Sequence, residues 1–428
     1  MNNDTICALA TTPGGAIGII RISGPQTFSV VSTLCSLSCD TVAANTIHYT
    51  HITDGTTVID EVLVSVFRAP HSYTGEDSVE ISCHGSAYIL NKVLELLVQN
   101  GCRMANPGEY TMRAYLNGKL DLSQAEAVAD LIASTNKATH QMAISQLRGG
   151  ISSELATLRD KLLHLTSLLE LELDFSDHED LEFANRTELQ FIANNIMARI
   201  TRLVQSYETG NALKNGIPVA IIGAPNVGKS TLLNAIVGEE RAIVSDIQGT
   251  TRDAIEDTIQ LGGITFRFID TAGIRHTDDK IETLGIERSI AAAQRARIIL
   301  LITEPGVPYP DIPVHNDQTI IRIENKTETF QAKYGIGLDL LRQQLMNAAP
   351  KTSDTDIIVT SARQHESLIQ ACKNLQRVID GLQLHFSTDL LAEDLRLVLS
   401  NLAEITGQKQ ITPQETLNNI FSHFCVGK

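Results

Sequence analysis

Residues 223–230, Gly223-Ala-Pro-Asn-Val-Gly-Lys-Ser230, decide the fold of the central part of this 428-residue chain. The segment has the form G-x-x-x-x-G-K-S, follows the apolar run Val219–Ile222 and opens the helix-like stretch Thr231–Val237. A strand, a glycine-rich loop and a helix in this order predict a phosphate-binding loop. Glycine lets the backbone close around phosphates, while loop N–H groups and the helix N-terminus supply positive potential. We predict that Lys229 reaches the β- and γ-phosphates and that the Ser230 hydroxyl ligates Mg²⁺.

Further segments arrive in the order expected of a GTP hydrolase. Gly249-Thr-Thr251 ends on a threonine that is placed to complete the Mg²⁺ coordination when a γ-phosphate is present. The strand-like run that starts at Phe266 delivers Asp270-Thr-Ala-Gly273. There the aspartate supports the metal through water and the glycine N–H senses the γ-phosphate.

A pair of residues after the next strand-like run, Asn325-Lys326, has the form of a guanine-recognition element. We expect the Asn325 amide on the purine edge and the Lys326 stem over the ring. Together these segments predict a GTPase.

The residue after Gly273 is Ile274, where Ras-like enzymes place a glutamine that orients the attacking water. Because isoleucine cannot orient water, hydrolysis needs another group. The carboxylates of Asp278, Asp279 and Glu282 lie further along the segment. From the residues alone, each is equally consistent with a solvated surface charge.

Composition limits the possible partners and location. The formal net charge of −16 argues against a broad nucleic-acid-binding surface, so any RNA contact must be local or shared with a partner protein. The start, MNNDTICALATTPGG, lacks the basic region of a signal peptide, and no apolar run approaches the roughly 20 residues of a membrane helix. We therefore expect a cytoplasmic protein without membrane contact. Scattered cysteines predict free thiols, at positions Cys7, Cys35, Cys39, Cys83, Cys102, Cys372 and Cys425.

The pattern along the chain predicts three regions. Residues 1–118 alternate short apolar runs with turns, which indicates a mixed α/β domain. Residues 214–350 alternate strands and helices, which is typical of a doubly wound α/β domain. Residues 119–213 and 351–428 carry apolar residues at three- and four-residue steps and are expected to be helical. We predict one helical domain interrupted by an inserted P-loop domain; the alternative is two separate bundles.

Segments spread over nearly the whole length resemble the tRNA uridine-5-carboxymethylaminomethyl modification GTPases, the MnmE or TrmE family. The most specific are the stretch Leu116-Asn-Gly-Lys-Leu-Asp-Leu122 and the C-terminal Phe424-Cys-Val-Gly-Lys428. The others, besides the GTPase segments, are Asp4-Thr-Ile, Gly18-Ile-Ile-Arg-Ile-Ser-Gly24, Thr74-Gly-Glu-Asp77, Glu80 with Cys83-His-Gly85, Pro107-Gly-Glu109, Gln124-Ala-Glu126 and Ile286-Glu-Arg288.

The resemblance implies a tetrahydrofolate-binding N-terminal domain that also forms a homodimer, a helical domain and an inserted Ras-like GTPase domain. It implies a heterotetramer with an FAD-dependent subunit, acting on C5 of the wobble uridine, position 34, of certain tRNAs. The one-carbon donor would be 5-formyl- or methylenetetrahydrofolate. Hydrolysis would depend on K⁺ as well as Mg²⁺, with the GTPase domains paired across their switch regions.

The resemblance also implies site residues. Glu282 matches the carboxylate that positions the attacking water. The folate-binding positions are Arg21, Glu80, Lys119 and Lys428, and the K⁺ ligands are Asn226, Ser245, Ile247 and Thr250. The expected Mg²⁺ ligands are Ser230 and Thr251. The expected GTP contacts are Asn226, Val227, Gly228, Lys229, Ser230, Thr231, Ser245, Asp246, Ile247, Gln248, Gly249, Thr250, Thr251, Asp270, Thr271, Ala272, Gly273, Asn325, Lys326 and Glu328.

The chain departs from the family pattern in the guanine element, which ends in Glu328 instead of aspartate. Glutamate keeps the carboxylate but lengthens the arm by one methylene, so guanine selectivity is expected to weaken. The last guanine loop has two candidates, Gln331–Lys333 and Ser361–Arg363, and the turn-like Gly335–Leu341 favours the first. The stretch from Thr303 to Lys333 is short, which predicts a trimmed back of the GTPase domain. The loop Thr12-Pro-Gly-Gly15 is also a residue short.

Two other functions are compatible with a GTPase domain. An RNA- or ribosome-assembly switch would carry a basic RNA-binding appendage, which the net charge of −16 argues against. A scaffold with weakened guanine selectivity is supported only by Glu328. The intact Lys229, Ser230, Thr251 and Asp270 favour an active enzyme.

Overall fold

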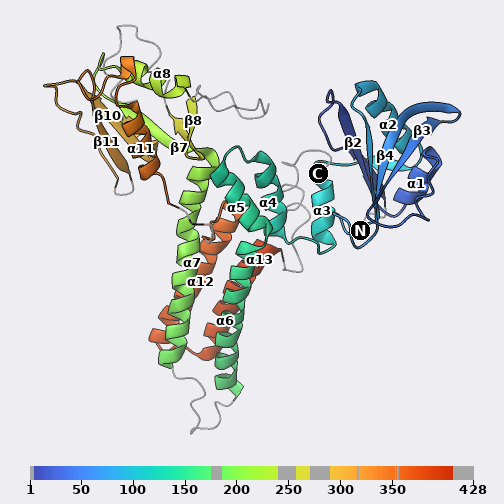
Figure 1. The fold of residues 1–428 in the computed structure, drawn as a ribbon. Helices are drawn as coiled ribbons and strands as arrows, with labels where there is room; N and C mark the ends of the chain where they lie inside the picture. The colour runs from blue at the N-terminus through green and yellow to red at the C-terminus, as the bar shows by residue number, and fades with distance from the viewer. Residues whose placement is uncertain are drawn as a thin grey trace. The chain divides into compact units, whose positions relative to one another are not determined.

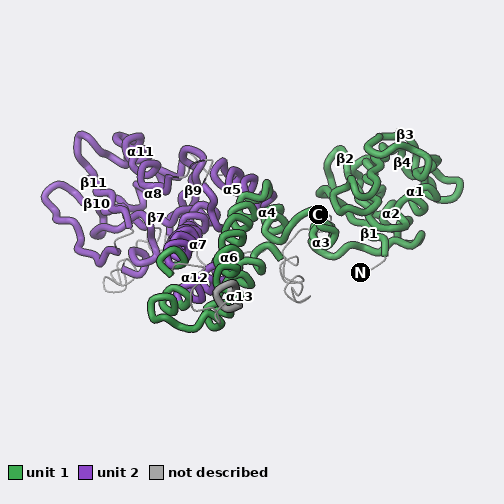
Figure 2. The backbone as a smooth tube through the Cα atoms, turned by 90° about the horizontal axis from the view of Figure 1, so that it is seen from below, with its two compact units in different colours: residues 1–129, 146–189, 377–428 green, residues 130–145, 190–376 purple. Residues whose placement is uncertain are grey.

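The chain folds into two compact units, as the computed structural model shows (Figure 2). The first unit comprises residues 1–129, 146–189 and 377–428, and the second comprises residues 130–145 and 190–376. The structure describes residues 4–174, 186–239, 257–269, 290–315, 318–351, 353 and 356–407. Within these ranges, none of the helices has the length and apolar character needed to cross a membrane.

The N-terminal part of the first unit is a six-stranded sheet whose strand order is β3-β4-β5-β2-β1-β6. Figure 1 draws this part of the chain in blue. Neighbouring strands are antiparallel except for β1 and β6, which are parallel. Their bounds are β1 Thr5–Leu9, β2 Ile17–Ser23, β3 Thr46–Asp54, β4 Thr57–Phe67, β5 Ser78–His84 and β6 Cys102–Met104. The mixed α/β prediction for this region is confirmed.

Alternation along the strands gives this sheet one apolar face. Ile20 and Ile22 of β2 and Val79 and Ile81 of β5 are fully buried, in one cluster with residues of α1 (Thr27–Leu34) and α2 (Ala87–Gln99). Because side chains alternate along a strand, Arg21 and Glu80 project from the opposite face. Helix α3 (Glu109–Leu116) follows β6 in the chain.

Helices from both sides of the phosphate-binding segment pack together within each unit. In the first unit, α6 (Gly150–Asp174) contacts α13 (Thr388–Thr406). The predicted apolar seams of both helices are buried, namely Ile151, Leu155, Leu158, Leu162, Leu165 and Leu169 on α6 and Leu391, Leu395, Val398, Leu402 and Ile405 on α13.

In the second unit, the Tyr207 ring of α7 (Arg186–Asn215) stacks on His365 of α12 (Ala362–Gln383) at 4.2 Å between centroids. The helices that precede and follow the α/β module thus contact each other, and the interrupted helical domain is confirmed.

The second unit contains a five-stranded sheet in the order β11-β10-β7-β9-β8, parallel except for β8. The bounds are β7 Ile217–Ile222, β8 Asp257–Leu261, β9 Ile264–Phe268, β10 Ile298–Thr303 and β11 Thr319–Glu324. One face packs on α8 (Lys229–Glu239) and α11 (Leu338–Ala348). The other face packs on Ala292 and Ala293 of the helical residues 290–295. Helices on both faces of a mostly parallel sheet confirm the doubly wound prediction.

Strand β11 forms one edge of this sheet within the described residues. Residues 304–315 between β10 and β11 contain neither helix nor strand, and the short 3₁₀ helix η1 (Ala332–Tyr334) follows β11 after a brief loop. The lack of a helix in the first of these connections and the shortness of the second agree with the expected trimming of the back of the GTPase domain.

Candidate nucleotide and N-terminal sites

The loop between β7 and α8 has the geometry of a phosphate-binding loop. A Cβ at residue 223 would lie 2.2 Å from the carbonyl oxygen of Ile302, so only glycine fits there. Gly228 has φ of +97°, where glycine is favoured. Asn226, the residue matched to a K⁺ ligand, adopts the left-handed conformation with φ of +64°, which is uncommon for a residue with a side chain. Both predicted glycines are therefore required by the local geometry.

Lys229 lies at the first turn of α8 and folds back over this loop. Its ammonium group donates to the carbonyl oxygens of Gly223 at 2.9 Å and Ala224 at 2.8 Å. Burial lowers the pKa of Lys229 below the usual lysine value. Lys229, which the sequence predicts to bind the phosphates, is thus hydrogen-bonded to the phosphate-binding loop itself. It lies next to Ser230 in the chain.

Asn325, at the end of β11, is a strut between the two halves of the predicted nucleotide site. Its side-chain N–H donates to the carbonyl oxygen of Val227 at 2.9 Å, and its side-chain oxygen accepts from the N–H of Ala332 at 3.1 Å. The Asn325 side chain is nearly fully buried. The contact with Ala332 places the loop Gln331–Lys333 beside the guanine element. The rival candidate, Ser361–Arg363, instead lies at the start of α12.

The rest of the guanine element is a turn closed by threonine. The hydroxyl of Thr327 accepts from the N–H of Phe330 at 3.0 Å, and Glu328 at the middle of this turn is exposed. Lys326, with φ of +63°, forms an ion pair with Glu304 at the end of β10. The guanine element thus forms a hydrogen-bonded turn, and its Glu328 carboxylate is open to solvent.

Many predicted site residues lie outside the described residues, so the structure leaves them as predictions. They are Ser245, Asp246, Ile247, Gln248, Gly249, Thr250, Thr251, Asp270, Thr271, Ala272, Gly273, Glu282 and Lys428. The structure reaches the edges of this set at Ile269, which is buried on the sheet, and at Asp257, the first residue of β8.

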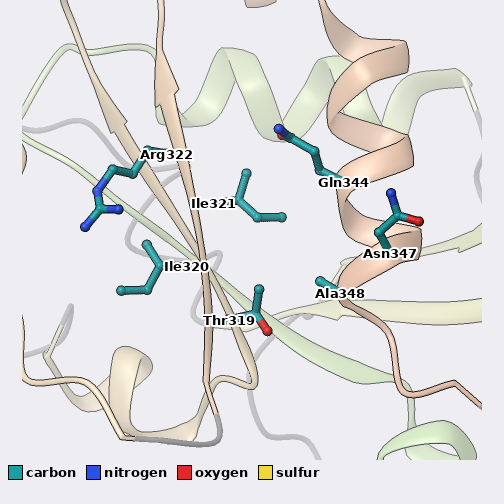
Figure 3. A pocket seen from close by; sticks show the side chains of 7 residues that line it. All are labelled: Thr319, Ile320, Ile321, Arg322, Gln344, Asn347 and Ala348. Atoms are coloured by element: carbon teal, nitrogen blue, oxygen red, sulfur yellow. The ribbon is translucent and has the colours of Figure 1, made fainter.

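A shallow groove of about 440 Å³ lies between β11 and α11 (Figure 3). Its lining contains none of the residues that the sequence predicts for nucleotide: Thr319, Ile320, Ile321, Arg322, Gln344, Asn347 and Ala348. It is a feature of the sheet edge and not of the nucleotide site.

Two of the predicted folate residues form a cross-strand ion pair. Arg21 of β2 and Glu80 of β5 are direct partners in the antiparallel register. The Nε and a terminal nitrogen of Arg21 both bond Oε1 of Glu80, at 2.9 and 2.8 Å. Both side chains are about one quarter exposed, so the pair is accessible from solvent while being held by the sheet.

Two tyrosines that the sequence did not single out flank Arg21. Its guanidinium carbon lies 5.6 Å from the ring centroids of both Tyr73 and Tyr110, within the range of a cation–π interaction. The Tyr110 hydroxyl also donates to the carbonyl oxygen of Arg21 at 2.7 Å. Each tyrosine borders a stretch that carries the family resemblance, because Tyr73 directly precedes Thr74–Asp77 and Tyr110 directly follows Pro107–Glu109.

The third described folate residue, Lys119, belongs to the same neighbourhood. Its ammonium group donates to the carbonyl oxygen of Pro70 at 3.0 Å. A Cβ at Gly75 would lie 3.2 Å from its side chain. Because Pro70 and Gly75 bracket Tyr73, the loop that covers Arg21 is also the loop that holds Lys119. The structure thus pairs Arg21 with Glu80 and bonds Lys119 to the loop that carries Tyr73.

A partly buried ionic cluster joins this loop to α3 and to the start of β1. Arg113 on α3 bonds Asp4 at 2.8 Å, Glu76 at 3.1 Å and Glu109 at 3.0 Å. Arg103 joins Glu109 to Asp4 as well. Burial works to raise the pKa of Glu109, but hydrogen bonds from Arg103, the Asn106 N–H and Arg113 outweigh it and hold the pKa below its usual value.

The described cysteines are all free, as predicted. Burial raises the pKa of Cys35 and that of Cys83 to about 12, which makes both thiols poor nucleophiles. In the described part of the chain, no group of three or more histidine, cysteine or acidic side chains has the arrangement of a metal site. Cys425 lies outside the described residues.

Comparison with known proteins identifies the family of this chain. A family model described as the MnmE helical domain matches residues 122–425, and one described as the GTP-binding protein TrmE N-terminus matches residues 5–119. The tRNA modification GTPase MnmE of Bacteroides thetaiotaomicron is 50% identical over 468 aligned residues, covering 100% of both chains. Those of Porphyromonas gingivalis and Flavobacterium johnsoniae are 47% and 46% identical, covering 100% of this chain and 98% and 100% of theirs.

The first alignment is longer than the 428 residues of this chain, so that relative contains residues that this chain lacks. Two matching models and relatives of about half identity over their full length show the family. The chain therefore belongs to the MnmE family of tRNA modification GTPases, enzymes that hydrolyse GTP and act in tRNA modification.

Proposed function

We propose that this chain is a K⁺-dependent GTPase that, with an FAD-dependent partner, modifies C5 of the wobble uridine of certain tRNAs with a tetrahydrofolate-borne one-carbon unit. The observation that carries the proposal is the cluster formed by the Arg21–Glu80 pair on the open face of the N-terminal sheet and by Lys119, which bonds the neighbouring loop at Pro70. A GTPase that served only as an RNA-assembly switch would have no use for this cluster.

The residues of the cluster fit a reduced folate. A pterin presents an amide edge that a carboxylate recognises, and the glutamate tail presents carboxylates that pair with cations. Both nitrogens of Arg21 bond Oε1 of Glu80, which holds the carboxylate in place on the sheet, where it would accept from a pterin. Lys119 and, from outside the described residues, Lys428 supply further cations. When bound, 5-formyl- or methylenetetrahydrofolate would supply the one-carbon unit.

The nucleotide site fits GTP with Mg²⁺. Lys229 and the loop N–H groups would hold the phosphates, while Asn325 and the adjacent Ala332 build the base side. Ser230 and Thr251 would ligate Mg²⁺, and Glu282 would position the attacking water. Asn226, in its left-handed conformation, would contribute to the K⁺ site with Ser245, Ile247 and Thr250.

The remaining parts of the proposal concern organisation. The N-terminal domain of residues 1–118 would bind folate and form the homodimer. Residues 119–213 with 351–428 would be the helical domain and residues 214–350 the GTPase domain, which would pair across the switch segments. Two copies would join two FAD-dependent subunits in a cytoplasmic heterotetramer.

Wobble-uridine analysis in cells tests the proposal. Cells that lack this protein should lose the carboxymethylaminomethyl or aminomethyl group, as read by mass spectrometry of tRNA nucleosides. The wild-type gene should restore the modification, while Lys229→Ala and Glu80→Gln should not. Glu61→Gln, a change to an exposed carboxylate of the same sheet, is the matched control and should restore it. Unchanged wobble uridine in the deletion strain would refute the proposal.

A further inference from the structure

The corner between α4 (Leu122–Ala133) and α5 (Lys137–Leu147) packs on the nucleotide-binding sheet and is hydrogen-bonded to it. The chain leaves the first compact unit after Ala129 and returns to it at Gln146, and residues 130–145 cluster with the second unit. A short piece of the helical sequence is therefore built into the module that binds nucleotide. Figure 1 shows α4 and α5 as two consecutive short helices.

Three hydrogen bonds join this corner to the β8–β9 hairpin. The side-chain N–H of Asn136 donates to the hydroxyl of Thr265 at 2.8 Å. The side chain of Gln260 donates to the carbonyl oxygen of Thr135 at 2.8 Å, and the N–H of Ala138 donates to the carbonyl oxygen of Gly263 at 3.1 Å. Both strands and the turn of the hairpin are held.

Apolar packing reinforces these bonds. Met142 of α5 is buried in the same core cluster as Ile259 of β8 and Phe266 of β9. Gly263, with φ of +80°, packs so closely on Lys137 that a Cβ there would lie 2.9 Å from the lysine side chain. The hairpin turn is thus packed so closely on the corner that Gly263 must be glycine.

The opposite end of the corner is anchored where the module joins the helices. Asp130 accepts from the ammonium group of Lys214 at 2.6 Å and from the hydroxyl of Thr360 at 3.0 Å. Lys214 closely precedes β7, and Thr360 closely precedes α12. The corner therefore spans from the point where the chain enters and leaves the module to the β8–β9 hairpin.

The hairpin connects the two segments that carry the catalytic predictions. Strand β8 begins at Asp257, shortly after Thr251, and β9 ends one residue short of Ile269, which directly precedes Asp270. Strand β9 also pairs with β7, which leads into the phosphate-binding loop. A shift of the hairpin would therefore displace the metal-side residues relative to Lys229, and small displacements of reacting groups cost rate steeply.

We propose that Asn136 is a positioning residue for GTP hydrolysis, which acts through its bond to Thr265. By fixing the hairpin to the corner, it holds β8 and β9 in register with β7, which leads into the phosphate-binding loop. Loss of the bond lowers turnover without weakening the nucleotide affinity that the loop and Asn325 provide. The inference concerns the GTPase reaction itself and stands apart from the folate proposal.

Steady-state GTP hydrolysis and GDP titration of the full-length chain test this role. Asn136→Ala and Thr265→Val should each lower kcat by about three- to tenfold and leave the Kd for GDP within about twofold. Thr265→Ser, which keeps the hydroxyl, should retain wild-type turnover. Asn194→Ala, the same chemical change on the exposed face of α7, is the matched control.

The double variant separates positioning from general damage. If the two residues act through their mutual bond, Asn136→Ala with Thr265→Val should be no slower than either single variant. Hydrogen exchange at residues 258–268 should quicken in both single variants, while exchange in β10 stays unchanged. Turnover within about 1.5-fold of wild type, a loss of GDP affinity in proportion to the loss of kcat, or multiplying losses in the double variant would each overturn the proposal.

Discussion

The side-chain N–H of Asn325 donates to the carbonyl oxygen of Val227 at 2.9 Å, and this bond ties the guanine element to the phosphate-binding loop. The two segments are separated by nearly a hundred residues, and their contact is buried. Gly228 has to be glycine partly for this reason, since a Cβ there would lie 2.5 Å from the same Asn325 nitrogen. The base and phosphate halves of the site are therefore joined by a direct, buried contact.

Replacement of Asn325 by aspartate should weaken binding of GDP and GTP alike. The carboxylate cannot donate to Val227, and a buried acceptor without a donor costs about 1–3 kcal/mol, or roughly 5- to 150-fold in affinity. Titration with a fluorescent guanine nucleotide measures the loss. Asn347→Asp, an exposed residue of α11, is the control and should bind as wild type. Equal affinities for the two variants would contradict the strut.

Glu328→Asp should strengthen the discrimination of guanine from other bases. An aspartate in this position accepts from the guanine N1–H and amine, and each charge-assisted hydrogen bond is worth roughly 1.5–3 kcal/mol when the geometry is right. Glu328 is exposed in its turn, so its longer arm is not held in one position by packing. Competition of GTP against ATP and XTP on both proteins is the measurement. A wild type that already excludes ATP by several orders of magnitude, with no gain in the variant, would show that glutamate is a full substitute.

Glu282→Ala should slow hydrolysis by about tenfold or more, or roughly 1.4 kcal/mol, and leave GTP affinity nearly intact. Ile274 occupies the position of the usual water-orienting glutamine, so another group must position the water. Single-turnover rates at saturating GTP test the expectation. Asp278→Ala and Asp279→Ala are the natural comparisons, and turnover within twofold of wild type for Glu282→Ala would remove this residue from the mechanism.

Hydrolysis should be faster in potassium chloride than in sodium chloride at equal ionic strength. A K⁺ ion held by Asn226 and the Ser245–Thr250 segment would stabilise the charge that develops on the phosphates, a task that an arginine performs in other GTPases. Asn226→Ala should reduce the difference between the two salts. Equal wild-type rates in both salts would exclude the potassium site.

The N-terminal ionic cluster should make the protein sensitive to acid. The folded-state pKa of Glu109 is below its usual value of 4.5, so folding favours the carboxylate. Such a group stabilises fully above its unfolded pKa, and the stabilisation is lost as the pH falls through the folded pKa. Urea unfolding followed on the N-terminal domain of the full chain should therefore show a midpoint that falls below about pH 4.5.

Glu109→Gln tests the assignment. The variant should be less stable at pH 7, because Arg103 and the buried Arg113 both lose their charge partner, and its midpoint should depend less on pH than that of the wild type. Glu95→Gln, on the exposed face of α2, should keep the wild-type pH dependence. Parallel pH profiles for Glu109→Gln and the wild type would contradict this role.

Local sequence patterns were sufficient for the frame of the molecule. The phosphate-binding loop follows from one octapeptide between a strand and a helix, and the buried seam of α6 follows from leucine spacing. Family resemblance identified Arg21 and Glu80, but only the antiparallel register of β2 and β5 shows that they form a pair.

Contacts between distant segments could not be derived in this way. No periodicity relates Asn136 to Thr265, because the bond depends on how a helical corner meets a hairpin more than a hundred residues later. The two tyrosines beside Arg21 were missed for the same reason, since an aromatic side chain in a loop or on a short helix is more often simply packed. Tertiary packing, and not local preference, creates these features.

The edge position of β11 has a consequence for handling and engineering this protein. The N–H of Thr319 and that of Asn325 point to the β10 side of the sheet. By alternation, the backbone polar groups of Ile320, Arg322 and Glu324 point away from it. Unpaired backbone groups at a strand edge are a template for self-association, and the exposed charges of Arg322 and Glu324 oppose such edge-to-edge pairing. Variants that neutralise both charges should be less soluble, because the edge of the sheet would then associate more readily with other copies.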